Sequence, residues 1–230
     1  KQLSAAKSIL GEPVLGEKAE LSLNSAGSLS GGIATAKLSA KRVDTKSGNF
    51  EIDLGFAGDD QEITLDIRLD EGHGGIAARL LGLPGEPSTK LHVTGSGPLD
   101  DLRTDIEIAT DGEDRVKGTV RLNATTPPVA GANPSRTFAA DIHGDISTLF
   151  APQYRPFFGD EISLVAEGER SAEGALEIST LDLATEALDL NGTVELNTEF
   201  WPTKLDLEGQ IRNDENSMIT LPISGAETKI

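Results

Sequence analysis

The sequence predicts an all-β chain: an elongated antiparallel sheet with one apolar face, carrying one or two short helices. The first observation is that apolar and polar residues alternate one by one, as in Glu62–Asp70, and successive side chains of a strand point to opposite faces. The second is that such segments recur between Gly, Asn, Asp and Pro, which is typical of antiparallel strands rather than βαβ units. We expect residues 1–230 to be a single continuous segment of something longer, with no separate second domain.

The alternating segments define the predicted strands in chain order. Residues of one parity are mostly Leu, Ile, Val or Phe, and those of the other parity are mostly charged or polar. This pattern indicates a sheet with one wet face and one apolar face that something must cover. The predicted strands are Glu20–Leu23, Phe50–Leu54, Glu62–Asp70, Lys90–Thr94, Asp105–Ile108, Val116–Leu122, Thr137–Ile142, Ile162–Glu167, Leu176–Ile178, Leu181–Leu183, Leu188–Leu190, Thr193–Leu196 and Lys204–Glu208.

Two segments interrupt the strands. Gly75–Leu81 has the Ala, Arg and Leu of a helix and ends at Gly82, with Pro84 behind it. Thr148–Gly159 holds the only Tyr and three of the seven Phe, and its two prolines forbid a long helix. We expect these segments to plug or cap the apolar face, or else to be ordinary segments anchored in a core. The predicted cap residues are Ile76, Leu80, Leu81, Phe150, Tyr154, Phe157 and Phe158.

A short internal repeat favours an extended architecture. Gly118–Asn123 matches Gly192–Asn197 except at one charged position, and Glu208–Asn213 is a looser relative. Together with the even strand spacing, the repeat favours an array in which each unit stacks on its neighbour over a closed, compact sandwich.

The charge balance excludes several classes of partner. The chain has 38 acidic and 20 basic residues, a net charge of −18. This charge repels phosphate backbones and anionic headgroups, so we expect no nucleic-acid binding and no electrostatic membrane binding. The chain has no cysteine, which leaves the redox compartment open. No signal sequence or apolar span is present, so we expect any targeting or anchoring segment to lie outside this chain.

The sequence offers no pattern that carries catalysis. His73, His92 and His143 have no partners at metal-ligand spacing. The carboxylates fall on the wet face or in turns, where solvation is their ordinary role. No nucleophile elbow, phosphate-binding loop or dinucleotide fingerprint occurs. We therefore predict that the chain is not an enzyme and has no catalytic residues, metal or cofactor.

The occupant of the apolar face decides between two hypotheses. If a second sheet covers it, the chain is an ordinary β-sandwich or barrel with a protein core. If it stays uncovered, the natural occupant is an acyl chain, because exposing a sixteen-carbon tail costs roughly 12 kcal/mol at about 0.8 kcal/mol per methylene. About a dozen strands spaced about 4.8 Å apart would form a trough roughly 55 to 60 Å long, which is longer than one lipid.

Under the second hypothesis, the apolar residues of the strands line the trough. They share one strand parity, and which face they occupy depends on the strand register. The predicted lining residues are Leu21, Leu23, Phe50, Ile52, Leu54, Ile63, Leu65, Ile67, Leu69, Leu91, Val93, Ile106, Ile108, Val120, Leu122, Phe138, Ile142, Leu164, Leu176, Ile178, Leu188, Leu190, Val194, Leu196, Leu205 and Leu207.

Four glycine- or aromatic-rich segments carry a resemblance to a known family. They are Gly74–Gly85, Gly95–Asp101, Ala109–Gly112 and Tyr154–Gly159. With them, and over essentially its whole length, the chain resembles the TamB proteins of Gram-negative bacteria, especially the alphaproteobacterial members, within the AsmA-like group. The resemblance implies that one N-terminal helix anchors the protein in the inner membrane. It also implies that the protein crosses the periplasm as a long β-sheet folded into a U-shaped, apolar-lined trough, of which residues 1–230 would be one continuous segment.

The resemblance also implies a function. TamB proteins are linked to phospholipid transport toward the outer membrane and, through the outer-membrane partner TamA, to assembly of autotransporters and other β-barrel proteins. The anchor and the region that contacts TamA lie outside this chain, and the family has no catalytic residues to transfer. Two alternatives stay open: a chaperone-like scaffold that holds unfolded β-barrel clients by strand addition, and a passive spacer or adhesin stalk that binds no lipid.

Overall fold

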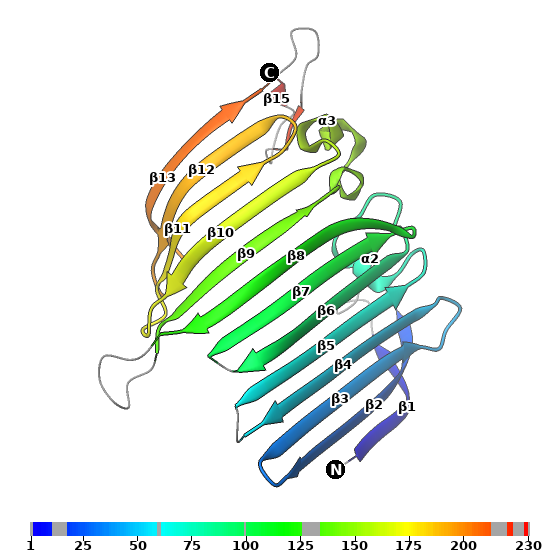
Figure 1. Cartoon of the computed structure of the whole chain (residues 1–230). Coiled ribbons are helices and arrows are strands. Elements are labelled where there is room, and N and C mark those ends of the chain that lie inside the picture. Colours follow the sequence, from blue (N-terminus) through cyan, green and yellow to red (C-terminus); the bar gives the residue numbers. More distant parts are fainter. Residues whose placement is uncertain are drawn as a thin grey trace. The chain divides into compact units, whose positions relative to one another are not determined.

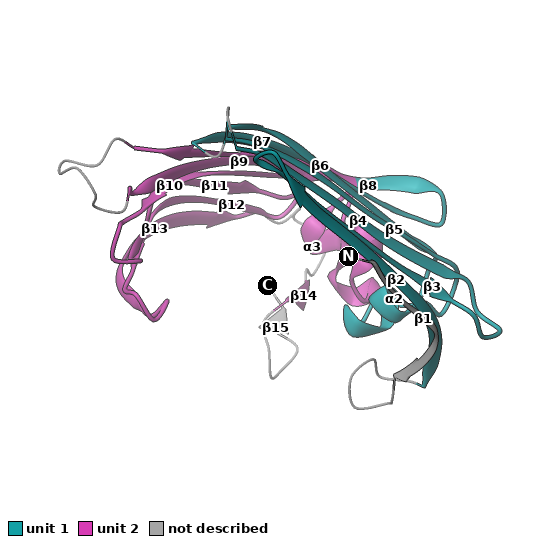
Figure 2. Cartoon of the chain, turned by 90° about the horizontal axis from the view of Figure 1, so that it is seen from below, with its two compact units in different colours: residues 1–115 teal, residues 116–230 magenta. Residues whose placement is uncertain are grey.

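The structure, a computed structural model, describes residues 2–10, 18–58, 61–98, 100–125, 134–212, 220–222 and 228–229. Contacts within the chain divide it into two compact units, Lys1–Arg115 and Val116–Ile230 (Figure 2). Both units consist of antiparallel strands that follow one another in chain order, with a few short helical segments (Figure 1). The predicted all-β antiparallel fold class is confirmed. The prediction of one continuous segment with no second domain stays a prediction.

Unit 1 is an antiparallel meander in which each strand pairs with its neighbour in the sequence. Such a sheet needs only short turns between its strands. The strands are β1 (Gln2–Leu10), β2 (Ala19–Ser30), β3 (Ile33–Arg42), β4 (Gly48–Ala57), β5 (Glu62–Glu71), β6 (Thr89–Pro98) and β7 (Asp101–Thr110).

The insertion between β5 and β6 contains α2 (Ile76–Leu80), as the sequence predicted. The helix stops because Gly82 adopts the left-handed conformation, with φ +64°, which a glycine takes without the steric cost of a Cβ.

Unit 2 repeats the meander. Its strands are β8 (Glu113–Ala124), β9 (Arg136–Gly144), β10 (Ile162–Arg170), β11 (Leu176–Ala184), β12 (Leu188–Leu196) and β13 (Pro202–Ile211). Successive antiparallel pairs join β8 to β13, with register shifts in the β10–β11, β11–β12 and β12–β13 ladders. A separate two-stranded ladder pairs β14 (Thr220–Leu221) with β15 (Thr228–Lys229).

Two strands of unit 2 were each predicted as two shorter strands. Leu176–Ile178 and Leu181–Leu183 belong to the single strand β11, where a register shift between Ile178 and Leu181 inserts one extra residue. Such a bulge changes the parity of the apolar positions while keeping them on one face, so the alternation looked interrupted. Likewise, Leu188–Leu190 and Thr193–Leu196 are both in β12, because Gly192 breaks the apolar pattern but not the strand.

The aromatic-rich segment of unit 2 forms three short turns of helix. They are η1 (Ser147–Leu149), η2 (Pro152–Tyr154) and α3 (Arg155–Phe158). Each proline falls in the first turn of its helix, the position that tolerates a missing N–H. The predicted absence of a long helix here is confirmed for the described residues.

Buried apolar side chains are few. Among the described residues, the buried apolar side chains are those of Ala19, Ala78, Phe157, Ile162, Ala187 and Leu221. No large side chain in the described ranges is less than 2 % exposed. A domain with two packed layers would bury many Leu, Ile and Val side chains completely. Within each unit, the described strands therefore form one curved layer without a second sheet packed on it (Figure 2).

Candidate functional site: an uncovered apolar sheet face

In unit 1, the register of β2 to β7 places the apolar residues on one face in four successive rows. None of the rows contains a charged residue. The rows are Leu23, Ala40, Phe50, Leu69, Leu91 and Ile108; then Ser25, Leu38, Ile52, Ile67, Val93 and Ile106; then Gly27, Ala36, Leu54, Leu65, Gly95 and Thr104; then Leu29, Ala34, Phe56, Ile63 and Gly97. We call this surface the unit 1 apolar face. All predicted lining residues of unit 1 lie in these rows except Leu21, which lies one row further, opposite Arg42.

The unit 1 apolar face is exposed toward the Leu29 row. Leu29 is 81 % exposed, Leu54 44 %, and Leu38 and Phe56 38 % each. The other large side chains of these rows are half-buried, mainly by their neighbours within the sheet. Adjacent exposed apolar side chains are typical of interaction surfaces, so this face is the candidate site.

The opposite face of the same strands is polar and carries ion pairs. Lys37 lies 2.8 Å from Asp53, Arg68 lies 2.6 Å from Asp66, and Lys90 lies 3.2 Å from Asp70. Most of these side chains are half-exposed or more, so the pairs contribute little to stability. Their effect is to keep this face solvated and to leave only the apolar face for an apolar ligand.

One end of the unit 1 apolar face is closed by a buried polar row. Arg42, Glu71, Thr89 and Thr110 follow the Leu23 row and are between 3 and 6 % exposed. Glu71 accepts a hydrogen bond of 2.7 Å from the backbone N–H of Ala77, in the first turn of α2. A carboxylate is favourable at this position because it satisfies an N–H that has no partner within the helix. Glu71 thereby holds α2 over the end of the sheet.

Arg42 is held in this row by Asp44. The Arg42 Nε–H group donates to both carboxylate oxygens of Asp44, and Asp44 also accepts the backbone N–H groups of Glu20 and Lys46. The Arg42 hydrogen bond is the main cause that lowers the pKa of Asp44 to about 2, and the two backbone hydrogen bonds lower it further.

The predicted cap residues on α2 do not all face the sheet. Ala78 is the buried side chain of the helix and Ile76 is half-buried. Leu80 and Leu81 are 60 and 69 % exposed. The structure therefore places these two leucines in water, and the buried side chain of α2 is that of Ala78.

Unit 2 presents a second apolar face of the same design. Its first three rows carry no charge, and the fourth, at the strand ends, contains two arginines. The rows are Gly118, Ile142, Leu164, Leu183, Leu190 and Gly209; then Val120, Ala140, Ala166, Leu181, Gly192 and Leu207; then Leu122, Phe138, Gly168, Ile178, Val194 and Leu205; then Ala124, Arg136, Arg170, Leu176, Leu196 and Pro202. Leu188, opposite Ile211, begins a further row. This unit 2 apolar face contains every predicted lining residue of unit 2.

Glycine at the unit 2 apolar face leaves room for an aromatic ring. A Cβ on Gly168 would lie 2.8 Å from two ring atoms of Phe138 and would collide with the carbonyl oxygen of Glu177. Phe138 is directly opposite Gly168 in the register. The ring therefore lies flat across the glycine, which keeps the surface level at this position.

The aromatic segment covers one end of the unit 2 apolar face. Phe157 is buried against Ala187 and Leu221, with Phe158 and Leu188 packed beside them. The carbonyl oxygen of Phe157 accepts hydrogen bonds from the Thr185 hydroxyl and the Ala187 N–H. The predicted cap residues Phe150, Phe157 and Phe158 come together: the rings of Phe150 and Phe158 stack at 3.9 Å, and those of Phe157 and Phe158 meet edge to face at 5.2 Å. The predicted cap residue Tyr154 is half-buried.

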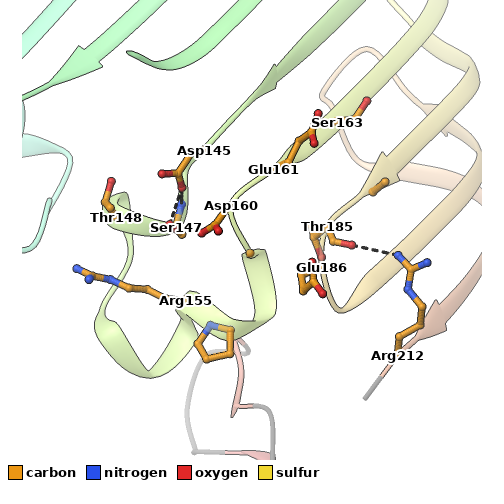
Figure 3. A pocket seen from close by; sticks show the side chains of 13 residues that line it. Asp145, Ser147, Thr148, Arg155, Asp160, Glu161, Ser163, Thr185, Glu186 and Arg212 are labelled. Carbon is orange, nitrogen blue, oxygen red and sulfur yellow. Dashed lines mark hydrogen bonds between the residues drawn. The ribbon is translucent and has the colours of Figure 1, made fainter. Parts of the chain in front are cut away.

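A hollow of about 1280 Å³ in unit 2 has a polar lining (Figure 3). Asp145, Asp160, Glu161 and Glu186 outnumber its two arginines, and Arg212 donates to the carbonyl oxygen of Thr185 at 3.2 Å. Ser163 and Ala184 line it from strand positions that alternate with those of the unit 2 apolar face. The hollow thus belongs to the wet side of the sheet and does not suit an acyl chain.

The three histidines lie on the surface beside single carboxylates. Their side chains are between 41 and 72 % exposed, and each has one aspartate within 3.9 Å. In the described part of the chain, no three His, Cys, Asp or Glu side chains are grouped to hold a metal ion. No described helix has the length and apolarity to span a membrane.

The fold and the site define a class of protein: one in which the described strands form antiparallel β-sheets with no second layer packed on their apolar face. No known protein family, no curated protein and no solved structure matches this chain. The resemblance to TamB proteins therefore remains a prediction from the sequence motifs.

Several residues of the two apolar faces were missed by the sequence analysis. They include the exposed Leu29 and Phe56 and four residues of β3, which alternates Ala34, Ala36, Leu38 and Ala40 with polar residues. The period-two signal is present there, but alanine contributes too little apolar area for the segment to stand out. Leu181 and Leu183 were within a predicted strand but not among the predicted lining residues, and the bulge before them explains the change of parity.

Proposed function

We propose that this chain is a segment of a TamB-like periplasmic bridge, and that its apolar faces shield phospholipid acyl chains on their way between the inner and outer membranes. The observation that carries the proposal is the unit 1 apolar face: four adjacent rows of mostly apolar residues, with no charge in any row and with Leu29, Leu38, Leu54 and Phe56 between 38 and 81 % exposed. By the same resemblance, the complete protein would be anchored in the inner membrane and would act with a TamA-like partner in outer-membrane protein assembly.

The size of the face supports an acyl chain as its occupant. Four rows along the strands and six strands across give a surface of about 20 by 24 Å, or roughly 500 Å². Covering such an area with hydrocarbon is worth about 12 kcal/mol as an upper estimate. That value is close to the roughly 12 kcal/mol that exposing a sixteen-carbon tail costs. One unit therefore offers enough apolar area to hold about one tail.

The chemical uniformity of the face supports movement as well as binding. No charged residue interrupts the four rows of unit 1. A tail that shifts from one strand to the next exchanges one set of methyl contacts for another, without a polar group to desolvate. The free energy of binding therefore changes little along the face, and a tail can slide.

Charge on the apolar face tests the proposal. Leu65→Asp and Val194→Arg place a charge within the rows of units 1 and 2. The matched controls Thr64→Asp and Thr193→Arg place the same charge on the neighbouring polar positions. We expect both apolar-face variants to lose the lipid that mass spectrometry finds in organic extracts of the purified wild-type protein, and both controls to retain it. Equal lipid in all four variants, or none in the wild type, would contradict acyl-chain binding.

A second candidate function, a scaffold for unfolded β-barrel clients, is favoured by the edge of unit 2. All ten residues of β13 are exposed, and among the described strands β13 pairs with β12 alone. An exposed edge strand is a template for strand addition. Competition between a lipid with a photoreactive acyl chain and an extended alternating peptide separates the two functions. If lipid displaces the peptide, both bind the same apolar face. If the peptide and the lipid bind independently, the peptide binds at the β13 edge, as the scaffold function requires.

The third candidate, a passive spacer, makes the simplest prediction. It requires that the purified protein carries no lipid and that no added acyl chain crosslinks to either apolar face. The extraction experiment with the wild-type protein distinguishes it from the proposed function.

A further inference from the structure

The turn between β12 and β13 exposes two neighbouring aromatic side chains. Phe200 is 60 % exposed and Trp201, the only tryptophan of the chain, is 68 % exposed. Large aromatic side chains are ordinarily buried in part, and two in succession at the tip of a hairpin form an apolar projection. The projection continues into Leu205 on β13, which is 58 % exposed.

Hydrogen bonds within the turn hold these side chains in place. The Asn197 Oδ1 atom accepts the N–H groups of Glu199 and Trp201 at 2.9 and 3.0 Å. The backbone of Asn197 also pairs with Phe200 and Trp201. The exposure of the aromatic rings is thus a property of an ordered turn.

Phe200 adopts a backbone conformation that is unfavourable for its residue type. Its φ is +62°, in the left-handed region that glycine and asparagine occupy at much lower cost. Nothing in the packing of an exposed ring compensates for this cost. Strained residues of this kind are retained at sites where the side chain has a function.

Two arginines lie at the same edge of the sheet. The last row of the unit 2 apolar face contains Arg136 and Arg170, both exposed, beside Leu176, Leu196 and Pro202. The turns next to this row carry Glu173 and Glu199. A Cβ on Gly174 would lie within 4.0 Å of both Arg170 and Thr198, so the two turns are adjacent. We call this edge, from Arg136 to Trp201, the aromatic rim.

We propose that the aromatic rim docks on the surface of a phospholipid bilayer. Trp and Phe partition to the boundary between headgroups and hydrocarbon, where their rings are apolar and the indole N–H remains hydrated. Arg136 and Arg170 are placed to meet lipid phosphates, which guanidinium groups bind well. The charge of −18 opposes binding elsewhere on the chain, so aromatic insertion, supported by two local cations, drives the docking.

This inference does not rest on the proposed function. The aromatic rim would still dock on a bilayer if the apolar faces bound no acyl chain. Conversely, the apolar faces could bind acyl chains even if the aromatic rim did not dock. Lipid extraction tests acyl-chain binding and vesicle binding tests docking, so the two can fail separately.

The single tryptophan makes the docking directly measurable. Vesicles of zwitterionic phosphatidylcholine, which offer phosphates without repelling the acidic chain, are titrated into the wild-type protein. We expect the Trp201 emission to shift to shorter wavelength and to be quenched by lipids with brominated acyl chains. An emission spectrum that does not change at saturating lipid would overturn the proposal.

Matched variants then locate the contact. Phe200→Asn removes an exposed ring and suits the left-handed conformation, so it cannot weaken binding by unfolding the turn; Leu29→Asn removes a comparably exposed side chain from unit 1. We expect Phe200→Asn to weaken vesicle binding about tenfold without lowering the unfolding midpoint, and Leu29→Asn to leave binding unchanged. If Leu29→Asn weakens binding as much as Phe200→Asn, the aromatic rim is not the docking surface.

Discussion

The Arg42 Nε–H group donates to both carboxylate oxygens of Asp44, at 2.9 and 3.1 Å, while the Arg42 side chain is only 2 % exposed. This pair lies where the unit 1 apolar face ends, in the row that also holds Glu71, so buried charge begins where the four uncharged rows stop. A buried cation is tolerated only with a close partner. Asp44 is therefore expected to be a principal determinant of the stability of this end of the sheet.

Removal of the Asp44 carboxylate should destabilise unit 1. We expect Asp44→Ala to lower the free energy of unfolding by about 3 kcal/mol, because it removes the carboxylate that accepts from a buried guanidinium. Chemical denaturation measures the effect. Asp53→Ala, at the exposed Lys37 pair, is the control and should change the free energy of unfolding by less than about 1 kcal/mol. Equal effects of the two substitutions would show that the Arg42 pair contributes no more than a surface ion pair.

The same carboxylate predicts a pH dependence. The pKa of Asp44 is lowered from 3.8 to about 2 in the folded protein. A lowered folded-state pKa stabilises the fold above the ordinary pKa, and this contribution is lost as the pH falls from about 4 through about 2. We expect the wild type to lose roughly 2 kcal/mol more than Asp44→Ala across this interval, measured by denaturation at a series of pH values. Parallel pH profiles would contradict this assignment.

Glu71 should control the attachment of α2. Because its carboxylate accepts the Ala77 N–H, Glu71→Ala should cost about 1 to 2 kcal/mol locally, and Glu71→Gln, which keeps an acceptor oxygen, should cost less. Amide hydrogen exchange measures the opening of residues 77–81. Faster exchange in Glu71→Ala but not in Glu107→Ala, on the polar face, is the expected result. Unchanged exchange in Glu71→Ala would mean that other contacts hold the helix.

Phe200 should be a site where stability can be gained. Relief of its left-handed backbone conformation in Phe200→Asn should raise the free energy of unfolding by about 1 kcal/mol, as measured by chemical denaturation. Glu199→Asn, at a neighbouring position without positive φ, is the control and should be nearly neutral. A loss of stability in Phe200→Asn would indicate that the exposed ring makes contacts that matter within the fold.

Gly168 should tolerate no side chain. A Cβ there collides with the Phe138 ring and with the Glu177 carbonyl oxygen, so we expect Gly168→Ala to cost about 1 to 3 kcal/mol. Gly27→Ala is the control, because a Cβ at Gly27 would make only an ordinary contact of 3.5 Å. Thermal unfolding of the two variants measures the difference. The prediction fails if Gly168→Ala unfolds at the wild-type temperature.

The one-sided pattern of the strands was visible in the sequence because large apolar residues recur at every second position. Leu65 and Ile67 could be assigned to one face from their parity alone, and the register places them there. The strand Ile33–Arg42 escaped because alanines occupy most of its apolar positions. The bulge in β11 was also not predicted, because the backbone accommodates the extra residue and no particular side chain indicates its position.

The buried polar row could not be predicted from alternation. Arg42 and Glu71 lie at the same alternate strand positions as the apolar residues. Because both are charged, the sequence pattern predicts that they are exposed to solvent. They are buried because the Gly72–Ser88 insertion returns over them and because Asp44 lies within reach. Both contacts join residues outside the strand pattern. The exposure of Leu80 and Leu81 is the converse case, since helix-forming leucines ordinarily indicate a packed face.

The pairing of every strand with its neighbour in the sequence has a consequence for how the chain acquires its structure. Each ladder closes a loop of one hairpin, so the entropy lost at each step is small and contact order is low. Assembly can therefore proceed hairpin by hairpin, as in other linear arrays whose stability is a sum of nearest-neighbour terms. The N-terminal strands of this chain can therefore pair during synthesis, before the C-terminal strands have been made.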